Sequence, residues 1–399
     1  MTLAAPTSKP SPSIGEFWTS GQRKASALHE ISYRACFKPQ IPAFFIERFT
    51  KPGELVYDPF MGRGTTILEA LLRGRRAVGN DVNPLSTILI EPRLRVPSLG
   101  HVQGRLSEIR FSSKAKSAID LSMFFHPKTE AELVSLKRYL KERSDNGAED
   151  SIDKWIRMVA TNRLTGHSPG FFSVYTLPPN QAVSAENQRR INRTLRQKPT
   201  YRNVKELILR KSSRLLKALS AEEAALLSKG ATSAMLLSND ARRVPQVGNG
   251  TVSLTVTSPP FLDIVNYAAD NWLRCWFNGI DAREIGRRIT MTRNIDDWVK
   301  IMQSVFVEMF RITREGGVVA FEVGEIRKKT LYLEDLVVPM GVHAGFKLEE
   351  ILINTQSFTK TSNIWGITNN RGGTNTNRIV VFRKPQEQRG RLKFRQRIL

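Results

Sequence analysis

The stretch from Glu54 to Asp81 constrains the fold of this chain more than any other. It reads ELVYDPFMGRGTTILEALLRGRRAVGND, in which two apolar runs enclose a glycine-containing turn and a segment of helical periodicity. The pattern predicts a strand over 54–60, a helix that ends near Gly74, and a second strand that ends at Asp81. Such a strand–turn–helix–strand unit builds a parallel sheet, so we expect an α/β fold.

The same kind of pattern returns in the second half of the chain. Residues 233–240 (SAMLLSND) and 251–261 (TVSLTVTSPPF) predict two more strands, and 296–312 predict an amphipathic helix. A buried strand is expected over 316–324. The segments GFKLEEILI and NRIVVFRK predict an antiparallel pair that closes the sheet, which is otherwise mostly parallel.

The charge of the chain indicates a polyanionic partner. Lys and Arg number 61 against 37 Asp and Glu, a formal net charge of +24. A cation beside a phosphate releases condensed counterions, so this excess favours nucleic acid; a surface charged for solubility is the alternative. Residues 189–217 carry eleven Lys and Arg against the single acid Glu206.

Other classes of protein are disfavoured by what the sequence lacks. The two cysteines, Cys36 and Cys275, form no CxxC pair, and the five histidines are scattered, so we expect neither a disulfide framework nor a metal site. The sequence shows no apolar run of membrane-spanning length and no signal-peptide pattern. We therefore expect a soluble, cytoplasmic protein without a membrane partner.

The glycine turn and two acids predict a nucleoside site. Gly62 and Gly64 would let a ligand approach the backbone where a helix begins. Asp58 ends the first strand, where a carboxylate can meet a cation, and Asp81 ends the second, where nucleotide-binding folds place an acid on ribose hydroxyls. Ile67 replaces the third glycine of a dinucleotide fingerprint, so a cationic nucleoside without pyrophosphate, S-adenosylmethionine, fits better. The alternative is a tight turn with two capping acids.

Several motifs resemble the amino-type DNA methyltransferases, which methylate an exocyclic amino group of a base. DPFMGRGTT followed by GNDVNPLS is similar to the family's cofactor motif, and ISYRACFKPQIPAFFIERF is similar to the segment before its first strand. TSPPF is similar to its catalytic motif of a polar residue, two prolines and an aromatic residue. The resemblance covers roughly 30–95 and 236–385 and implies a Rossmann-like methyltransferase sheet.

The resemblance also implies the residues that bind S-adenosylmethionine. The segment that contains Phe37, with its neighbours Lys38 and Pro39, would pack over the methionine end of the cofactor. Asp240, which ends LLSND, would contact the adenine. The full set implied is Phe37, Asp58, Phe60, Gly62, Gly64, Thr65, Asp81 and Asp240.

The catalytic residues implied are Ser258, Pro259, Pro260 and Phe261. The lone pair of an exocyclic amine is delocalised into the base, so the site needs acceptors that turn it toward the methyl group; the Ser258 hydroxyl and Pro259 carbonyl can supply them. The prolines stiffen the turn, and Phe261 can stack on a base flipped out of the duplex. Transfer is then a direct displacement that depends on orientation and needs no covalent nucleophile.

Composition and motif order divide the chain into five segments. Residues 1–19 are expected to be disordered and 386–399 to form a basic tail. The catalytic domain would comprise 20–98 and 236–385, and the largely helical, basic insert 99–235 would recognise the target sequence. Within the insert, the side chains expected to contact duplex DNA are Arg189, Arg190, Arg193 and Arg196.

The identity of the target base remains open between alternatives. Ser258 favours N4 of cytosine, because adenine enzymes of the family mostly carry Asp or Asn before the two prolines. The alternatives are N6-adenine methylation, RNA base methylation, and a catalytically silent nucleic-acid-binding protein. The resemblance further implies a prokaryotic protein, associated with the nucleoid through its DNA, and allows a cognate restriction endonuclease encoded separately.

Overall fold

The structure is a computed structural model, and its described residues are 12–15, 17, 25–33, 38–176, 183–260, 267–288, 294–323, 325–326, 331–355 and 376–387. The predictions made for Phe37 and Phe261 lie outside these residues. Most of the segments 1–19 and 386–399 also lie outside them.

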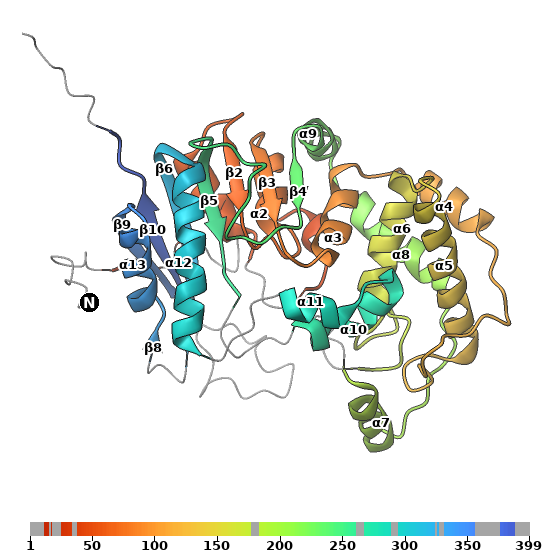
Figure 1. Ribbon diagram of the computed structural model, residues 1–399. Coiled ribbons are helices and arrows are strands. Elements are labelled where there is room, and N and C mark those ends of the chain that lie inside the picture. The colour runs from red at the N-terminus through yellow and green to blue at the C-terminus, as the bar shows by residue number, and fades with distance from the viewer. Residues whose placement is uncertain are drawn as a thin grey trace, which may run out of the picture.

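An eight-stranded sheet forms the centre of the protein, with the order β1-β9-β10-β6-β5-β2-β3-β4 (Figure 1). Strand β10 runs antiparallel to β6 and β9, and the other neighbours are parallel. This confirms the expected Rossmann-like sheet with a closing antiparallel pair. Its strands are β1 (Ser13–Gly15), β2 (Leu55–Asp58), β3 (Arg76–Asn80), β4 (Met235–Leu237), β5 (Val252–Thr257), β6 (Thr313–Val323), β9 (Lys347–Thr355) and β10 (Thr376–Arg383).

Two short features extend or flank this sheet. Strand β1 belongs to the segment 1–19, for which composition predicted disorder. Residues 13–15 are instead ordered, because their backbone groups pair with strand β9 at the edge of the sheet. A separate two-stranded ribbon consists of β7 (Glu325–Ile326) and β8 (Leu331–Tyr332).

Strand β6 is buried on both faces, which is typical of the centre of a parallel sheet. Val318 and Ala320 face the core formed with α1 (Gln40–Phe49) and α2 (Thr65–Leu72). Val319 and Phe321 face the opposite core, formed with α12 (Ile295–Ile312) and α13 (Glu334–His343). The alternation follows from the two-residue period of a strand and places helices over both faces of the sheet.

The expected insert is helical, and its helices lie to one side of the sheet (Figure 1). Each of the six helices begins at a residue whose side chain accepts a hydrogen bond from the first turn. Helix α9 packs on α2 and on α3 (Leu85–Leu94), so it also covers the sheet domain. The six are α4 (Leu99–Glu108), α5 (Pro127–Asp145), α6 (Ser151–Arg163), α7 (Ala185–Thr194), α8 (Val204–Lys217) and α9 (Ala221–Ala231).

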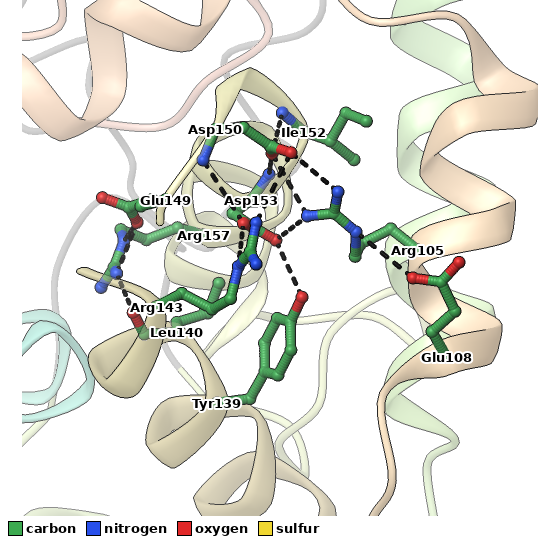
Figure 2. A network of polar contacts seen from close by, with 10 residues as sticks. All are labelled: Arg105, Glu108, Tyr139, Leu140, Arg143, Glu149, Asp150, Ile152, Asp153 and Arg157. Carbon is green, nitrogen blue, oxygen red and sulfur yellow. Dashed lines mark hydrogen bonds and ion pairs between the residues drawn. The ribbon is translucent and has the colours of Figure 1, made fainter. Parts of the chain in front are cut away.

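A buried acid joins three of these helices (Figure 2). The Asp153 carboxylate accepts hydrogen bonds from Arg105 Nη1 at 2.5 Å and Arg143 Nε at 2.8 Å, and from the Tyr139 hydroxyl at 3.2 Å. The two guanidinium groups come from α4 and α5, and Asp153 itself lies in the first turn of α6. A fully buried carboxylate is tolerable only with such partners, so this cluster fixes how the three helices pack.

The remaining helices precede or follow the insert in the sequence. The 3-10 helix η2 (Ala27–His29) lies before α1, while α10 (Tyr267–Asn278) and α11 (Ala282–Arg288) lie between β5 and α12. Within the described part of the chain, no helix combines the length and apolarity needed to cross a membrane.

In the turn between β2 and α2, a side chain at Gly64 should lower the stability of the protein through a steric clash. Gly64 has φ +77°, and a Cβ there would lie 2.4 Å from Ile90 Cγ1. Gly250 has φ +62°, and beyond its chain neighbours no heavy atom lies within 4 Å of the position that a Cβ would take, so it is a matched control for backbone strain alone. We expect Gly250→Ala to lower the free energy of unfolding by about 1 kcal/mol and Gly64→Ala by about 2–4 kcal/mol. Urea denaturation measures both; equal losses would contradict the steric argument.

Candidate cofactor and catalytic site

A pocket lies where β2, β3, β4 and β5 end, at the carboxyl edge of the parallel strands. Its empty space, open mouth included, is about 770 Å³. Ligands of open α/β sheets bind at this edge. Six of the residues predicted from the sequence line the pocket: Phe60, Gly62, Asp81, Asp240, Ser258 and Pro260.

The other predicted residues have different positions. Asp58, Gly64, Thr65 and Pro259 lie near lining residues along the chain but do not line the pocket themselves. Thr65 is buried at the start of α2, and Pro259 is buried between two lining residues. The structure therefore brings the glycine turn and the TSPPF turn to one cavity, although the insert separates them in sequence.

Asp81 holds the glycine turn in place. Its Oδ2 accepts a hydrogen bond from the Gly62 N–H at 2.9 Å, and its Oδ1 accepts one from the Asn83 N–H at 2.9 Å. Gly62 has φ +48°, a conformation that glycine adopts readily. Burial raises the pKa of Asp81, but the backbone donors oppose this effect. The carboxylate lines the pocket and keeps lone pairs that a ligand hydroxyl could use.

Asp58 fastens β2 to β5 beneath the pocket. Its Oδ1 accepts hydrogen bonds from the Thr257 hydroxyl at 2.7 Å and the Phe60 N–H at 3.0 Å. The sequence predicts that this carboxylate meets a cation, whereas in the structure these hydrogen bonds come from neutral donors. Because the side chain is buried, desolvation raises the pKa of Asp58 to about 6.

Asn80 connects the loops that follow β2 and β4. Its Nδ2 donates to the Asn239 carbonyl at 3.0 Å and to the Pro59 carbonyl at 3.4 Å, and its Oδ1 accepts from the Asn239 N–H at 2.9 Å. The side chain is fully buried and lines the pocket. The sequence analysis did not identify Asn80 as a site residue. Its position could have indicated this role, because its amide ends a buried strand and directly precedes Asp81.

Three apolar lining residues come from helix α12. Ile301, Met302 and Val305 share the face of the helix that meets the pocket. The amphipathic pattern of 296–312 predicted this helix but not that part of its apolar face contacts a ligand, because lining and core residues have the same composition. Arg288, at the end of α11, is a further lining residue that was missed; its Nη2 donates to the Ser238 carbonyl at 3.3 Å.

Tyr33 also lines the pocket, and two arginines hold its segment there. The Tyr33 hydroxyl accepts from Asn83 Nδ2 at 3.2 Å. Arg63, in the glycine turn, donates to the carbonyls of His29 and Ile31, both at 3.1 Å. The fully buried Arg93 donates to the Leu28 carbonyl at 3.0 Å. The segment before α1 is thereby tied to the cofactor turn through its backbone.

Asp240 lies at the pocket mouth in an ion pair. Arg242 contacts both carboxylate oxygens, with Nη2 at 2.5 Å from Oδ2 and Nε at 2.9 Å from Oδ1. The pKa of Asp240 is lowered chiefly by its hydrogen bond with Arg242. The contact of this acid with adenine stays a prediction.

A tryptophan of α12 holds the described part of the TSPPF motif, residues 257–260. The indole Nε1 of Trp298 donates to the Pro260 carbonyl at 3.2 Å, and the ring is almost completely buried. Ser258 is partly exposed and lines the pocket directly after β5. The turn therefore has fixed anchors on both sides, Thr257 on Asp58 and Pro260 on Trp298.

The four arginines predicted to contact DNA are exposed. Arg189, Arg190 and Arg193 lie on α7, and Arg196 follows its last turn. Helix α7 stands apart from the rest of the helical region (Figure 1). Arg189 forms an exposed ion pair with Asp120 at 2.7 Å, which is weak enough to be exchanged for another anion.

The strand order, the glycine turn and the acid after β3 are those of a Rossmann-like methyltransferase fold. Residues 4–87 match the model of a DNA methylase family of the N6/N4 type. The Type II methyltransferase M.MjaII of Methanocaldococcus jannaschii is 31% identical over 77 residues, 19% of this chain and 14% of that protein. M.BsoBI, a Type II methyltransferase of Geobacillus stearothermophilus, is 22% identical over 304 residues, 70% of this chain and 58% of that protein.

The chain is similar to the amino-type DNA methyltransferases, which its motifs predicted, and S-adenosylmethionine is the cofactor of that family. It spans less than two thirds of the length of the two relatives named above. A crystal structure of an S-adenosylmethionine-dependent methyltransferase from Methanosarcina mazei is 9% identical, with a TM-score of 0.34, over 86% of this chain and 98% of that one. The fold assignment rests on the strand order of this chain itself.

The pKa of Asp58 predicts how stability depends on pH. The pKa is raised from an ordinary value near 4 to about 6, so the folded protein binds this proton more tightly than the unfolded chain. The stability that protonation contributes is therefore complete below about pH 4 and is lost as pH rises toward 6. Between these values we expect the wild type to lose about 2–3 kcal/mol relative to Asp58→Asn, whose amide does not titrate. Denaturant unfolding of both proteins between pH 4 and 6 measures this difference in the free energy of unfolding. If the free energies of the two proteins changed with pH in parallel, the prediction would be contradicted.

Proposed function

We propose that this protein is a DNA methyltransferase that transfers the methyl group of S-adenosylmethionine to N4 of cytosine in duplex DNA. The observation that carries the proposal is one pocket lined by both Asp81 of the cofactor motif and Ser258 of the catalytic motif. Either motif alone would be compatible with an ordinary turn. Their meeting in one cavity supports a site where a nucleoside cofactor and a second ligand lie side by side.

The residues of the pocket fit the cofactor. Asp81 would accept hydrogen bonds from ribose hydroxyls, and the apolar side chains of Val82, Ile301 and Val305 offer a wall for a purine ring. Asp240, at the mouth, would contact the adenine amino group. When bound, S-adenosylmethionine supplies an electrophilic methyl group on a sulfonium.

The TSPPF turn would hold and orient the target amino group. The Ser258 hydroxyl and the Pro259 carbonyl are acceptors that can take the two amino protons and so direct the nitrogen lone pair. The carbonyl of Pro260, the next residue, accepts a hydrogen bond from Trp298, and this contact would keep the backbone of the turn in one conformation. The amino proton released after transfer would pass to solvent, directly or relayed through the Ser258 hydroxyl. Such positioning supplies much of the rate enhancement of a direct displacement.

Duplex DNA is the substrate class that the charge supports. The net charge of +24 and the exposed arginines 189, 190, 193 and 196 favour a phosphate backbone. A base within the duplex cannot reach the pocket, so the target must be flipped out. The helical insert would recognise the sequence around the target, and a separately encoded restriction endonuclease is the partner such an enzyme would have.

We propose cytosine rather than adenine as the target base because residue 258 is a serine. A serine hydroxyl accepts from the amino group without a full negative charge, and the smaller pyrimidine suits this arrangement. N6-adenine methylation remains the alternative, since the two chemistries share the fold, the cofactor and the two prolines.

The first prediction of this proposal concerns cofactor affinity. Asp81→Ala should weaken S-adenosylmethionine binding about tenfold or more, because a charge-assisted hydrogen bond to ribose is lost. Asp81→Asn keeps one acceptor and should have a smaller effect. Isothermal titration calorimetry measures both, with melting temperatures to confirm that the turn is intact. Unchanged affinity in Asp81→Ala would exclude this carboxylate from the ligand site.

The second prediction of this proposal concerns which methylated base the enzyme forms. Wild-type enzyme should form N4-methylcytosine and no 5-methylcytosine in duplex DNA, identified by mass spectrometry and retention time after digestion to nucleosides. Ser258→Ala should lower turnover roughly 10²-fold or more with cofactor affinity intact, a loss on the order of an oxyanion-hole donor. Ser253→Ala, which removes a hydroxyl from the same strand outside the pocket, is the matched control. N6-methyladenine as sole product would favour the adenine alternative.

A further inference from the structure

A second group of positive charges lies away from α7, where the end of α6 meets α8. Arg163 ends α6, and Arg210, Lys211 and Arg214 lie on α8. One acid, Glu30, contacts two of them: its Oε2 lies 2.9 Å from Lys211 Nζ and 2.9 Å from Arg214 Nε. A single carboxylate is thus shared between two cations, and the group as a whole keeps an excess of positive charge.

Arg163 has no ion pair with a carboxylate in the described part of the chain. Its Nε and Nη2 donate to the carbonyl and side-chain oxygen of Asn162, at 3.2 and 3.1 Å, and its guanidinium lies 4.1 Å from the centroid of the Phe171 ring. Burial, and then the nearby charges of Arg214 and other arginines, lower the pKa of Arg163 to about 10, although Glu30 opposes them. The group stays charged at neutral pH, and its neighbours are largely of the same sign.

This arrangement costs free energy that an anion would recover. A guanidinium stacked on a ring has a fixed orientation and presents its remaining N–H groups in a rigid fork. Phe171 is buried, so the ring supports Arg163 and is not available to wedge into a duplex. Phosphate oxygens are the anions that such a fork binds best. The exposed Arg210 and Arg214 add positive charge beside it.

The group is tied to the segment that lines the pocket. The Ser32 carbonyl accepts hydrogen bonds from Asn162 Nδ2 and Arg274 Nη2, both at 3.0 Å, and Ser32 precedes the pocket residue Tyr33. Glu30 is three residues from Tyr33, a separation of at most about 10 Å along an extended chain. The side chain of Asn162 contacts both the Arg163 guanidinium and the Ser32 carbonyl, so an anion held at Arg163 would lie beside the segment that contributes Tyr33 to the pocket.

We propose that Arg163, Arg210 and Arg214 form a binding site for a backbone phosphate of the DNA strand that carries the flipped nucleotide. The inference rests on the proposed function, since it takes duplex DNA as the ligand. It assigns a phosphate contact next to the pocket, in addition to those expected from α7. Glu30 then keeps the site partly neutralised until DNA displaces it from Arg214.

The test measures binding of the full-length protein to a labelled duplex of mixed sequence by fluorescence anisotropy at several salt concentrations. Arg210→Gln with Arg214→Gln should weaken binding several-fold to tenfold or more and reduce the slope of log affinity against log salt by about 0.9 per lost phosphate contact. Arg110→Gln with Arg138→Gln removes two exposed arginines elsewhere and the same total charge, and should leave the slope unchanged. Equal effects of the two pairs would overturn the site.

Glu30→Gln separates a binding role from a merely structural one. If the site binds phosphate, removal of its acid should tighten DNA binding, because the cations lose their competing partner. If the arginines only hold the segment before α1, the same variant should lower the melting temperature and leave DNA affinity unchanged or weaker, which would overturn the proposal. Arg163→Lys, which keeps the charge but not the fork, should weaken binding without changing the melting temperature by much. A wild-type protein that binds S-adenosylmethionine but no duplex at low salt would contradict the proposed function itself.

Discussion

The buried carboxylate of Asp58 accepts hydrogen bonds from the turn after β2 and from the end of β5, the strand that leads into the second loop of the site. The donors are the Phe60 N–H in the turn after β2 and the hydroxyl of Thr257, which directly precedes Ser258. The two loops can meet there because β2 and β5 are adjacent parallel strands whose carboxyl ends coincide. An unpaired carboxylate at this depth would be costly, and its two neutral donors offset part of that cost while fixing the distance between the loops.

The other walls of the pocket are fixed in a similar way, through backbone groups. Asn80 joins the loops after β2 and β4, and Asp81 holds the Gly62 N–H. Arg63 and Arg93 bind carbonyls of the segment before α1. Side chains that bond to backbone atoms position whole loops, so the pocket can be shaped before any ligand arrives.

The sheet and the strand-end residues could be predicted because they follow local rules. An apolar run that ends in Asp81 or in Ser258 places a polar group at the carboxyl edge of a parallel strand. The lining face of α12 could not be predicted, because Ile301 and Val305 satisfy the pattern of an ordinary core helix. Asn80 could not be distinguished from the other residues of its strand. Strand β1 could not be predicted either, because it is only three residues long and depends on pairing with β9, far away in sequence. The charge group at Arg163 comes from α6, α8 and the segment before α1, whose proximity only the tertiary structure reveals.

The sheet order also has a consequence for how the chain acquires its fold during synthesis. Strands β2 and β3 lie side by side and are made early, but their outer neighbours, β5 and β4, are made only after all six helices of the insert. Those helices carry their own caps and pack mainly on one another and on the earlier helices α2 and α3, so they can form while β2 and β3 still have unpaired edges. The nascent sheet is therefore most exposed to wrong pairing during that interval. Closure by β4 and β5 ends it, and the cavity is complete only once α12, which supplies three of its lining residues, has also been made.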